Sequence, residues 1–152
     1  MILVIPPGTG SPEFWICKIN NPAMHELSII YSILETAEAE VRRHDPSGEI
    51  AEIELEIGEL AGVEVSTLEF LWPAAVENTM LEQAACHIIR VPGKASCSDC
   101  GAIFAVQQFY DPCPDCASHL IQIIQGEELR IKSLTLVERK PHILTQMQQN
   151  WN

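Results

Sequence analysis

The chain has 152 residues, of which 47% are hydrophobic and only 6% aromatic, and its formal net charge is −12 from 21 acids and 9 bases. This length suits one domain, or one small domain with an appended module. The acidic balance excludes a nucleic-acid binder and docking on anionic lipid, because both need a basic surface. No apolar run reaches the ~20 residues that a membrane helix needs, so we expect a soluble, cytoplasmic protein.

Residues 1–23 are interpreted as an extension rather than as part of the fold. Their apolar stretch, residues 2–5, has no basic residues before it and ends at two prolines, so it is too short for a secretion signal. The run Gly-Ser-Pro-Glu-Phe at 10–14 resembles a cloning-site linker, and Met24 is a natural place for a chain to start. We therefore expect a vector-derived segment in which Cys17 has no functional role; a native disordered arm is the alternative.

Two helices are predicted after this extension. Apolar residues recur at helical spacing over residues 27–41, with Glu26 in the first turn and Arg42 and Arg43 in the last, as the helix dipole favours. The second helix is predicted to open on the capping-box pattern Ser66-x-x-Glu69 and to continue through Val76.

Several strands are predicted from alternating and β-branched patterns. Residues 49–58 alternate apolar side chains with Glu52, Glu54 and Glu56, which indicates a half-buried strand with a solvated acidic face. The further candidates are residues 85–91, a short run at 119–124, and residues 130–138.

Helices and strands segregate along the chain instead of alternating strictly. This order predicts an α+β fold in which two helices pack on a small mixed or antiparallel sheet, with a four-cysteine module inserted. We divide the chain into the extension at 1–23, an α+β domain at 24–92 plus 126–140, a metal-binding module at 93–125 and a flexible tail at 141–152.

Four of the six cysteines form two Cys-x-x-Cys knuckles: Cys97, Cys100, Cys113 and Cys116. Each tight turn brings two thiolates to one side, and four thiolates complete the tetrahedral shell that structural zinc prefers. A rubredoxin-like iron site uses the same ligands and is an alternative to zinc. A dithiol redox pair is a further alternative, with less support. No Lys or Arg lies between residues 97 and 126, which argues against a nucleic-acid-binding zinc ribbon.

Two further candidate ligands near these knuckles are assigned no metal. Cys86 alternates with apolar neighbours in a predicted strand, which favours a buried side chain. His119 follows the last knuckle by three residues, but four thiolates already complete the shell. A surface position near the metal is therefore the simpler expectation for His119.

A second metal site is suggested at the start of the first predicted helix. If translation begins at Met24, its α-amine, the His25 backbone amide and the His25 imidazole lie on one contiguous stretch. These nitrogens form a chelate suited to square-planar Ni(II) or Cu(II). The pair His25–Glu26 is a weak signal by itself, because the helix dipole also explains Glu26.

Three motifs, in this order, resemble the HypA family, the nickel-insertion accessory proteins of nickel–iron hydrogenase maturation. They are Met-His-Glu-Leu-Ser-Ile at 24–29, Glu-Ile-Gly-Glu-Leu at 56–60 and the paired knuckles, and the resemblance covers about residues 24–140. It implies an α+β nickel domain bearing a zinc-ribbon module, with structural zinc at the four paired cysteines. It also implies a nickel site with these ligands: the Met24 amine, His25, Glu26 and, by its place in the loop after the first strand, Glu64.

The resemblance further implies two partners, the GTPase HypB and the precursor of the hydrogenase large subunit, and leaves open whether the chain forms a homodimer. One departure from the family pattern concerns histidines that flank the knuckles in some relatives. They are absent next to Cys100 and Cys116. A pH-linked change of zinc ligation through such histidines is therefore not expected here, and His119 is the only nearby candidate for it.

We therefore predict a nickel metallochaperone and not an enzyme, because the sequence has no Gly-rich phosphate loop, Ser/His/Asp set or isolated nucleophile motif. A chelate at a chain terminus suits transfer better than a buried cage. The alternative is a zinc-ribbon interaction module without a nickel role, in which His25 and Glu26 merely start a helix. A metal-dependent hydrolase, the third option, would need an open catalytic zinc.

Overall fold

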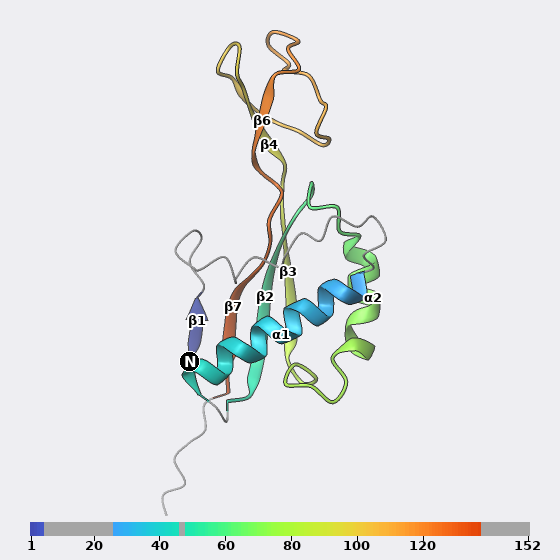
Figure 1. Cartoon of the computed structure of the whole chain (residues 1–152), viewed down its shortest axis with the longest axis vertical. Helices are drawn as coiled ribbons and strands as arrows, with labels where there is room; N and C mark the ends of the chain where they lie inside the picture. Colours follow the sequence, from blue (N-terminus) through green and yellow to red (C-terminus); the bar gives the residue numbers. More distant parts are fainter. Residues whose placement is uncertain (5–25, 46–47, 138–152) are drawn as a thin grey trace, which may run out of the picture.

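The computed structural model describes residues 1–4, 26–45 and 48–137 of the chain. They form a four-stranded sheet with two helices and a three-stranded sheet placed beyond its end, which makes the molecule elongated (Figure 1). Within these described ranges, no helix has the length and apolarity to cross a membrane.

The larger sheet is mixed and has the strand order β1-β7-β2-β3. Its strands are β1 (Ile2–Val4), β7 (Leu129–Leu136), β2 (Ile50–Gly58) and β3 (Ala85–Val91). The central strand β2 pairs parallel with β3 and antiparallel with β7. The predicted α+β fold with a small mixed sheet is confirmed.

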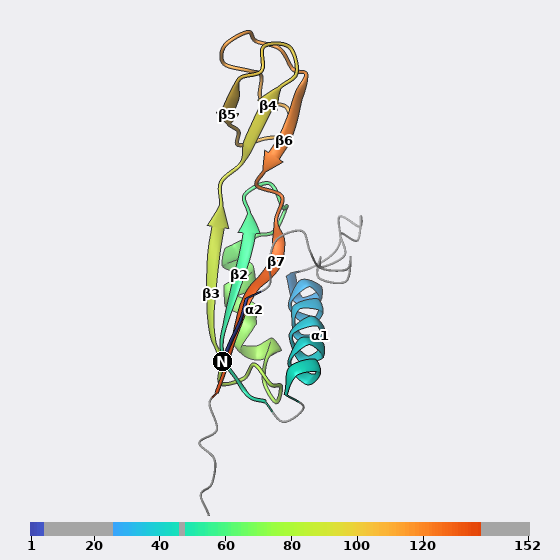
Figure 2. The same cartoon turned by 90° about the vertical axis from the view of Figure 1, so that its left-hand side faces the viewer.

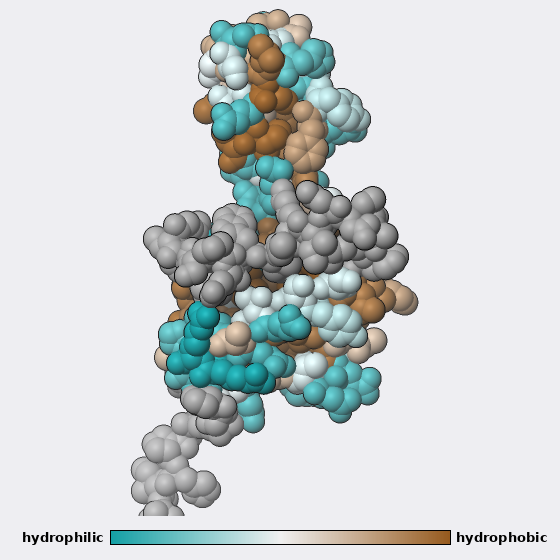
Figure 3. All heavy atoms as spheres, viewed as in Figure 1, coloured by the Kyte–Doolittle hydropathy of each residue, from teal (hydrophilic) through white to brown (hydrophobic). Residues whose placement is uncertain are grey.

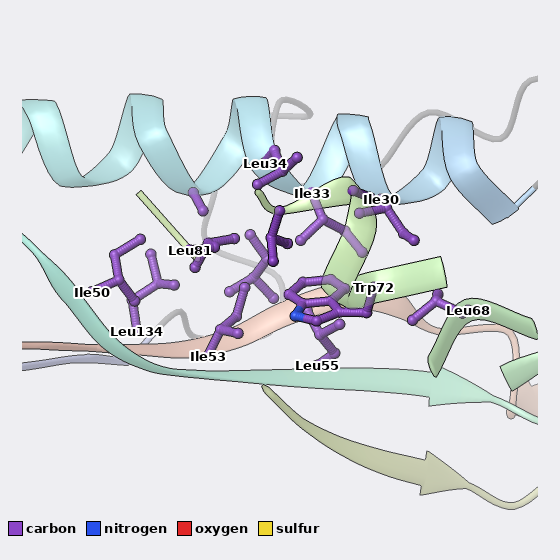
Figure 4. Close-up of a cluster of buried hydrophobic side chains, with 14 of the residues drawn as sticks. Ile30, Ile33, Leu34, Ile50, Ile53, Leu55, Leu68, Trp72, Leu81 and Leu134 are labelled. Carbon is purple, nitrogen blue, oxygen red and sulfur yellow. The ribbon is translucent and has the colours of Figure 1, made fainter. Parts of the chain in front are cut away.

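Both helices, α1 (Glu26–His44) and α2 (Val65–Ala75), cover the same face of this sheet (Figures 1 and 2). The residues of α1 that face the sheet are fully or almost fully buried and recur at helical spacing: Ile30, Ile33, Leu34, Ala37 and Val41. Trp72 of α2 lies between α1 and the inward-facing Leu55 of β2 (Figure 4). Burial of each such aliphatic side chain stabilises the fold by about 1.5–3 kcal/mol, so this layer holds the start of α1 at a fixed place.

The acidic face of β2 is not simply solvated, contrary to the expectation for its glutamates. The antiparallel register places Arg130 of β7 opposite Glu56, and the Nε of Arg130 donates to Oε2 of Glu56 at 2.8 Å. Ser133 Oγ donates to Oε2 of Glu54 at 2.6 Å. Of these three glutamates, Glu52 is exposed and the other two are half-buried. The neighbouring strand β7 thus supplies one cation and one hydroxyl to two glutamates that the sequence shows as an unpaired row of charges.

The smaller sheet carries the knuckles and has the order β5-β4-β6, all antiparallel. Its strands are β4 (Lys94–Cys97), β5 (Ile103–Ala105) and β6 (Ile121–Gln125). We call residues 93–125 the cysteine module. Its core has three buried apolar residues, and one of them, Leu60, comes from the loop between β2 and α2; the other two are Ala95 and Val106.

The two sheets meet where three glycine backbones touch. A Cβ on Gly58 would lie 1.9 Å from the carbonyl oxygen of Gly126, and a Cβ on Gly126 would lie 2.6 Å from Cα of Gly93. The backbone N–H of Leu60 donates to the Gly126 carbonyl at 2.7 Å. The close approach of these three backbones leaves no room for a side chain at Gly58 or Gly126.

Residues 2–4 belong to the larger sheet, which corrects the expectation that the first 23 residues lie outside the fold. Strand β1 pairs antiparallel with β7, with Leu3 opposite Leu134, and Leu3 packs against the main core. The physical reason is that a free strand edge pairs with any extended apolar segment that reaches it. Cys17 and the tail at 141–152 lie outside the described residues.

Candidate metal centres

The four knuckle cysteines converge on one point. Their sulfur atoms all lie within 4.8 Å of one another, and two Sγ–Sγ distances, Cys97 to Cys116 and Cys100 to Cys113, are 3.6 Å. A tetrahedron with Zn–S bonds of 2.3 Å has edges of about 3.8 Å. The donor set and its spacing therefore fit a structural zinc site with four sulfur ligands. A zinc ion held by all four would have no open coordination position for a substrate.

The two knuckles have the same backbone geometry. The residue after the second cysteine of each, Gly101 and Ala117, has positive φ, +75° and +57° respectively. Its N–H donates to the carbonyl of the first cysteine, Cys97 or Cys113, at 3.0 and 2.8 Å. This repeated turn aims both thiolates of a knuckle to one side. Gly101 adopts the left-handed conformation without the steric cost that a side chain brings.

The environment of the thiols favours a bound cation. The backbone N–H of Cys100, followed by that of Asp99, lowers the pKa of the Cys97 thiol to about 7 against the effect of burial. The Ser118 N–H lowers the pKa of Cys116, but the thiol of Cys100, burial and the other two thiols raise it to about 12. Four thiolates this close would repel one another. The four thiols therefore all lose their protons only when a cation binds between them.

Cys86 and His119 stand apart from this cluster. Cys86 is half-buried against the main core, and burial, with a smaller contribution from Glu69, raises the pKa of its thiol to about 11. His119 is exposed, and its Nδ1 lies 3.2 Å from the carbonyl oxygen of Tyr110. Neither residue belongs to the group of ligand atoms that the described residues bring together.

The cysteine module exposes much apolar surface for its size (Figure 3). Its largest exposed apolar side chains, each at least half exposed, are Ile103, Phe109, Tyr110, Leu120 and Ile124. A unit that buries so little and exposes so much needs its metal to hold the fold. The same surface is available for contact with other proteins.

The second candidate centre lies where α1 and α2 both begin. The backbone N–H of Glu64 donates to Oε1 of Glu26 at 3.4 Å. The first residue of α1 and the residue before α2 are therefore neighbours, although the sequence separates them by 38 positions. Of the four predicted nickel ligands, the structure brings these two together; Met24 and His25 lie outside the described residues.

Glu64 is the N-cap of α2, which corrects the predicted capping box. The helix begins at Val65, and Oε1 of Glu64 accepts hydrogen bonds from the backbone N–H of Ser66 at 3.3 Å and from its hydroxyl at 2.7 Å. Glu69 is exposed and caps nothing. The pattern Ser66-x-x-Glu69 misplaced the start because a glutamate two residues earlier offers the same kind of acceptor.

These contacts leave one oxygen of each carboxylate available. Oε2 of Glu26 and Oε2 of Glu64 make no hydrogen bond to any residue in the described ranges. The Ser66 hydroxyl, the Ser66 N–H and, to a smaller extent, the charge of Arg90 lower the pKa of Glu64. Two ionised carboxylates at one place can supply oxygen ligands to a divalent cation. Arg90, on the helix-facing side of β3, is a neighbour of this centre that the sequence alone did not indicate.

Comparison with known proteins gives a consistent result. Residues 24–136 match the family model HypA, described as hydrogenase/urease nickel incorporation, metallochaperone. The hydrogenase maturation factor HypA of Parabacteroides distasonis is 45% identical over 115 residues, which cover 74% of this chain and 97% of that protein. The factor of the same name from Geobacter sulfurreducens is 42% identical over 113 residues, with 73% and 97% covered.

Solved structures agree on the fold. The solution structure of the Ni metallochaperone HypA from Helicobacter pylori superposes with a TM-score of 0.56 at 24% identity, covering 76% of this chain and 100% of that one. A second solution structure of a HypA protein gives a TM-score of 0.55 at 25% identity, with 76% and 98% covered.

Proposed function

The chain belongs to the HypA family of nickel-incorporation metallochaperones, and from this premise we propose that it carries Ni(II) at the start of α1 and releases it during hydrogenase maturation. In this proposal the nickel ligands are the nitrogen of Met24, His25, Glu26 and Glu64. The α+β domain at 24–92 plus 126–140 holds nickel, and the module at 93–125 holds zinc.

The contact between Glu64 N–H and Glu26 Oε1 is the observation that carries this proposal. His25 precedes Glu26 in the chain, and in this proposal its imidazole binds the same ion as the two carboxylates. Imidazole nitrogen and carboxylate oxygen are both suitable ligands for Ni(II). Ligands supplied by a chain segment and a loop, with no buried cage, suit a protein that must give up its cargo.

The segment before Met24 affects this chelate. With residues 1–23 attached, the Met24 nitrogen is a peptide amide, which has no ready donor lone pair. Nickel then depends on His25 and the two carboxylates. We expect protein that begins at Met24 to bind nickel more tightly, and with a different absorption spectrum, than the full chain.

Zinc has a structural role in the proposed mechanism. The four thiolates fit a closed shell, and the module they hold offers exposed apolar surface. We propose that this surface contributes to binding of the partners that the family resemblance implies, the GTPase HypB and the hydrogenase large-subunit precursor. The acidic chain also suits a partner with a basic surface.

Calorimetric titration with Ni(II) tests the proposal. The variant His25→Ala should lose most of the nickel affinity, while His87→Ala, which removes an exposed histidine on β3, should leave it unchanged. Elemental analysis should find one zinc per chain before and after loading, and one exchangeable nickel after it. If His25→Ala binds nickel as tightly as the unmodified chain, a chaperone function through this site is wrong, and His25 and Glu26 merely start a helix, as in the alternative of a zinc-ribbon interaction module.

A further inference from the structure

Strand β1 pairs with the edge of β7 that faces away from β2, and β1 lies outside the part of the chain that matches the family. The family match spans residues 24–136, so it includes all of β7 and none of β1. We propose that this edge, Ser133–Leu136, is an acceptor site for an extended segment of a partner protein, and that residues 1–4 occupy it in this chain. The proposal concerns protein binding and is independent of the nickel site.

The contacts of residues 1–4 show what the edge recognises. The backbone N–H of Leu136 donates to the Met1 carbonyl at 2.9 Å, and the Met1 amine donates to the Leu136 carbonyl at 3.3 Å. Hydrogen-bonded pairs alternate along an antiparallel ladder, so Leu3 and Leu134 form the next such pair. Backbone bonds of this kind give affinity without depending on the sequence of the added strand.

Side-chain selection comes from the one inward-facing position. Leu3 packs against the main core beside β7, whereas Ile2 and Val4 point outward and are 65% and 67% exposed. An added strand therefore needs an aliphatic residue where Leu3 lies. The outward positions share a face with the glutamates of β2, so neutral or basic residues suit them and acidic ones do not.

A bulge on β7 sets the length of the acceptor site. The register between β2 and β7 shifts between Ser133 and Ile131, which leaves Lys132 without an opposite residue. Val4, the last described residue of β1, lies opposite Ser133, directly before this bulge. Bulges and lysines are the usual devices that stop a sheet edge from extending. The site therefore accepts about four residues and is blocked beyond them.

The test uses the full chain with the substitution Leu3→Asp, which removes the inward aliphatic contact of the resident strand. Exchange of the Leu136 amide should become at least tenfold faster, while that of Ile53 in the centre of the sheet should not change. The matched control Ile2→Ser alters an outward-facing side chain and should leave both rates unchanged. If the Leu136 amide stays protected from exchange in Leu3→Asp, the inward contact of Leu3 does not hold the added strand on β7, and this part of the proposal is wrong.

The probe is a peptide of residues 1–5 followed by two lysines, titrated by NMR into the Leu3→Asp chain and the unmodified chain. We expect it to shift the Leu134 and Leu136 amide signals of the variant and to bind the unmodified chain at least tenfold more weakly. N-methylation at Leu3 of the peptide removes the N–H that faces β7 and should abolish binding. N-methylation at Ile2, whose N–H faces away, should not.

Two results would overturn the proposal. One is no binding of the unmethylated peptide to the Leu3→Asp chain, or equal binding of both methylated peptides. The other is a dimer of the unmodified chain that Leu3→Asp dissolves, together with no peptide binding; the edge would then serve strand exchange between copies. Unchanged nickel binding in His25→Ala, which would contradict the proposed function, would affect neither result, so the two proposals fail separately.

Discussion

The carboxylate of Glu26 accepts a hydrogen bond from the backbone N–H of Glu64 at 3.4 Å, across 38 positions of sequence. This contact joins the first turn of α1 to the cap of α2. It means that Glu64 has two tasks at once, one for the helix through Oε1 and one, in our proposal, for nickel through Oε2.

The two tasks of Glu64 can be separated by substitution. Glu64→Gln keeps an oxygen that can cap α2 and removes the charge, so the free energy of unfolding should stay close to that of the unmodified chain. Nickel affinity measured by calorimetry should fall by roughly tenfold or more. The control Ser66→Ala removes the hydroxyl donor at 2.7 Å but keeps the carboxylate, and should bind nickel as the unmodified chain does. Unchanged affinity in Glu64→Gln would remove Glu64 from the ligand set.

The pH dependence of the α2 cap follows from the lowered pKa of Glu64. A carboxyl whose pKa is lower in the folded state than the usual 4.5 stabilises the fold above that pH. The contribution is then lost as the pH falls from 4.5 through the folded-state pKa. An NMR titration of the Glu64 carboxyl should show an upward shift of its midpoint in Ser66→Ala and a smaller upward shift in Arg90→Gln, since the Ser66 hydroxyl is the larger cause. A larger shift in Arg90→Gln would contradict this order.

The cysteine module should depend on its metal while the larger sheet does not. Cys97→Ser removes a ligand that is only 2% exposed, so zinc should be lost and the NMR signals of residues 93–125 should collapse to disordered positions. Signals of α1 and β2 should persist, because their core is separate. Cys86→Ala, which removes a thiol outside the cluster, should retain one zinc at a cost of about 1 kcal/mol. Zinc retention in Cys97→Ser with an intact module would contradict this assignment.

The glycine junction should be intolerant of a single methyl group. Gly126→Ala combines φ of +107° with a Cβ placed 2.6 Å from Gly93, so we expect a loss of about 2–5 kcal/mol in the free energy of unfolding by denaturant titration. Gly62→Ala is the matched control, because its φ is +72° but nothing lies within 4 Å of the added Cβ. It should cost only about 1–2 kcal/mol. Equal losses in the two variants would mean that close approach at the junction does not matter.

Much of the fold follows from local patterns. The period of the apolar residues places α1 and its buried face, and alternation places β2 and the inward residues Ile53, Leu55 and Ile57. The zinc site is equally predictable, because two Cys-x-x-Cys turns carry most of their geometry within a few residues. The start of α2 was misplaced, since Glu64 and Ser66 compete for the cap and only the packed helix shows which residue fills it.

Composition, periodicity and spacing by themselves determined an acidic α+β chain with a four-thiolate site, because each of these is set by neighbours along the sequence. The tertiary structure alone decided which distant residues meet: Glu26 with Glu64, Arg130 with Glu56, and Leu60 with the core of the cysteine module. Such contacts depend on strand order and register, and neither can be read from the sequence of a single segment. The same reason explains why Ile2–Val4 became a strand, since an edge selects its partner only after the sheet exists.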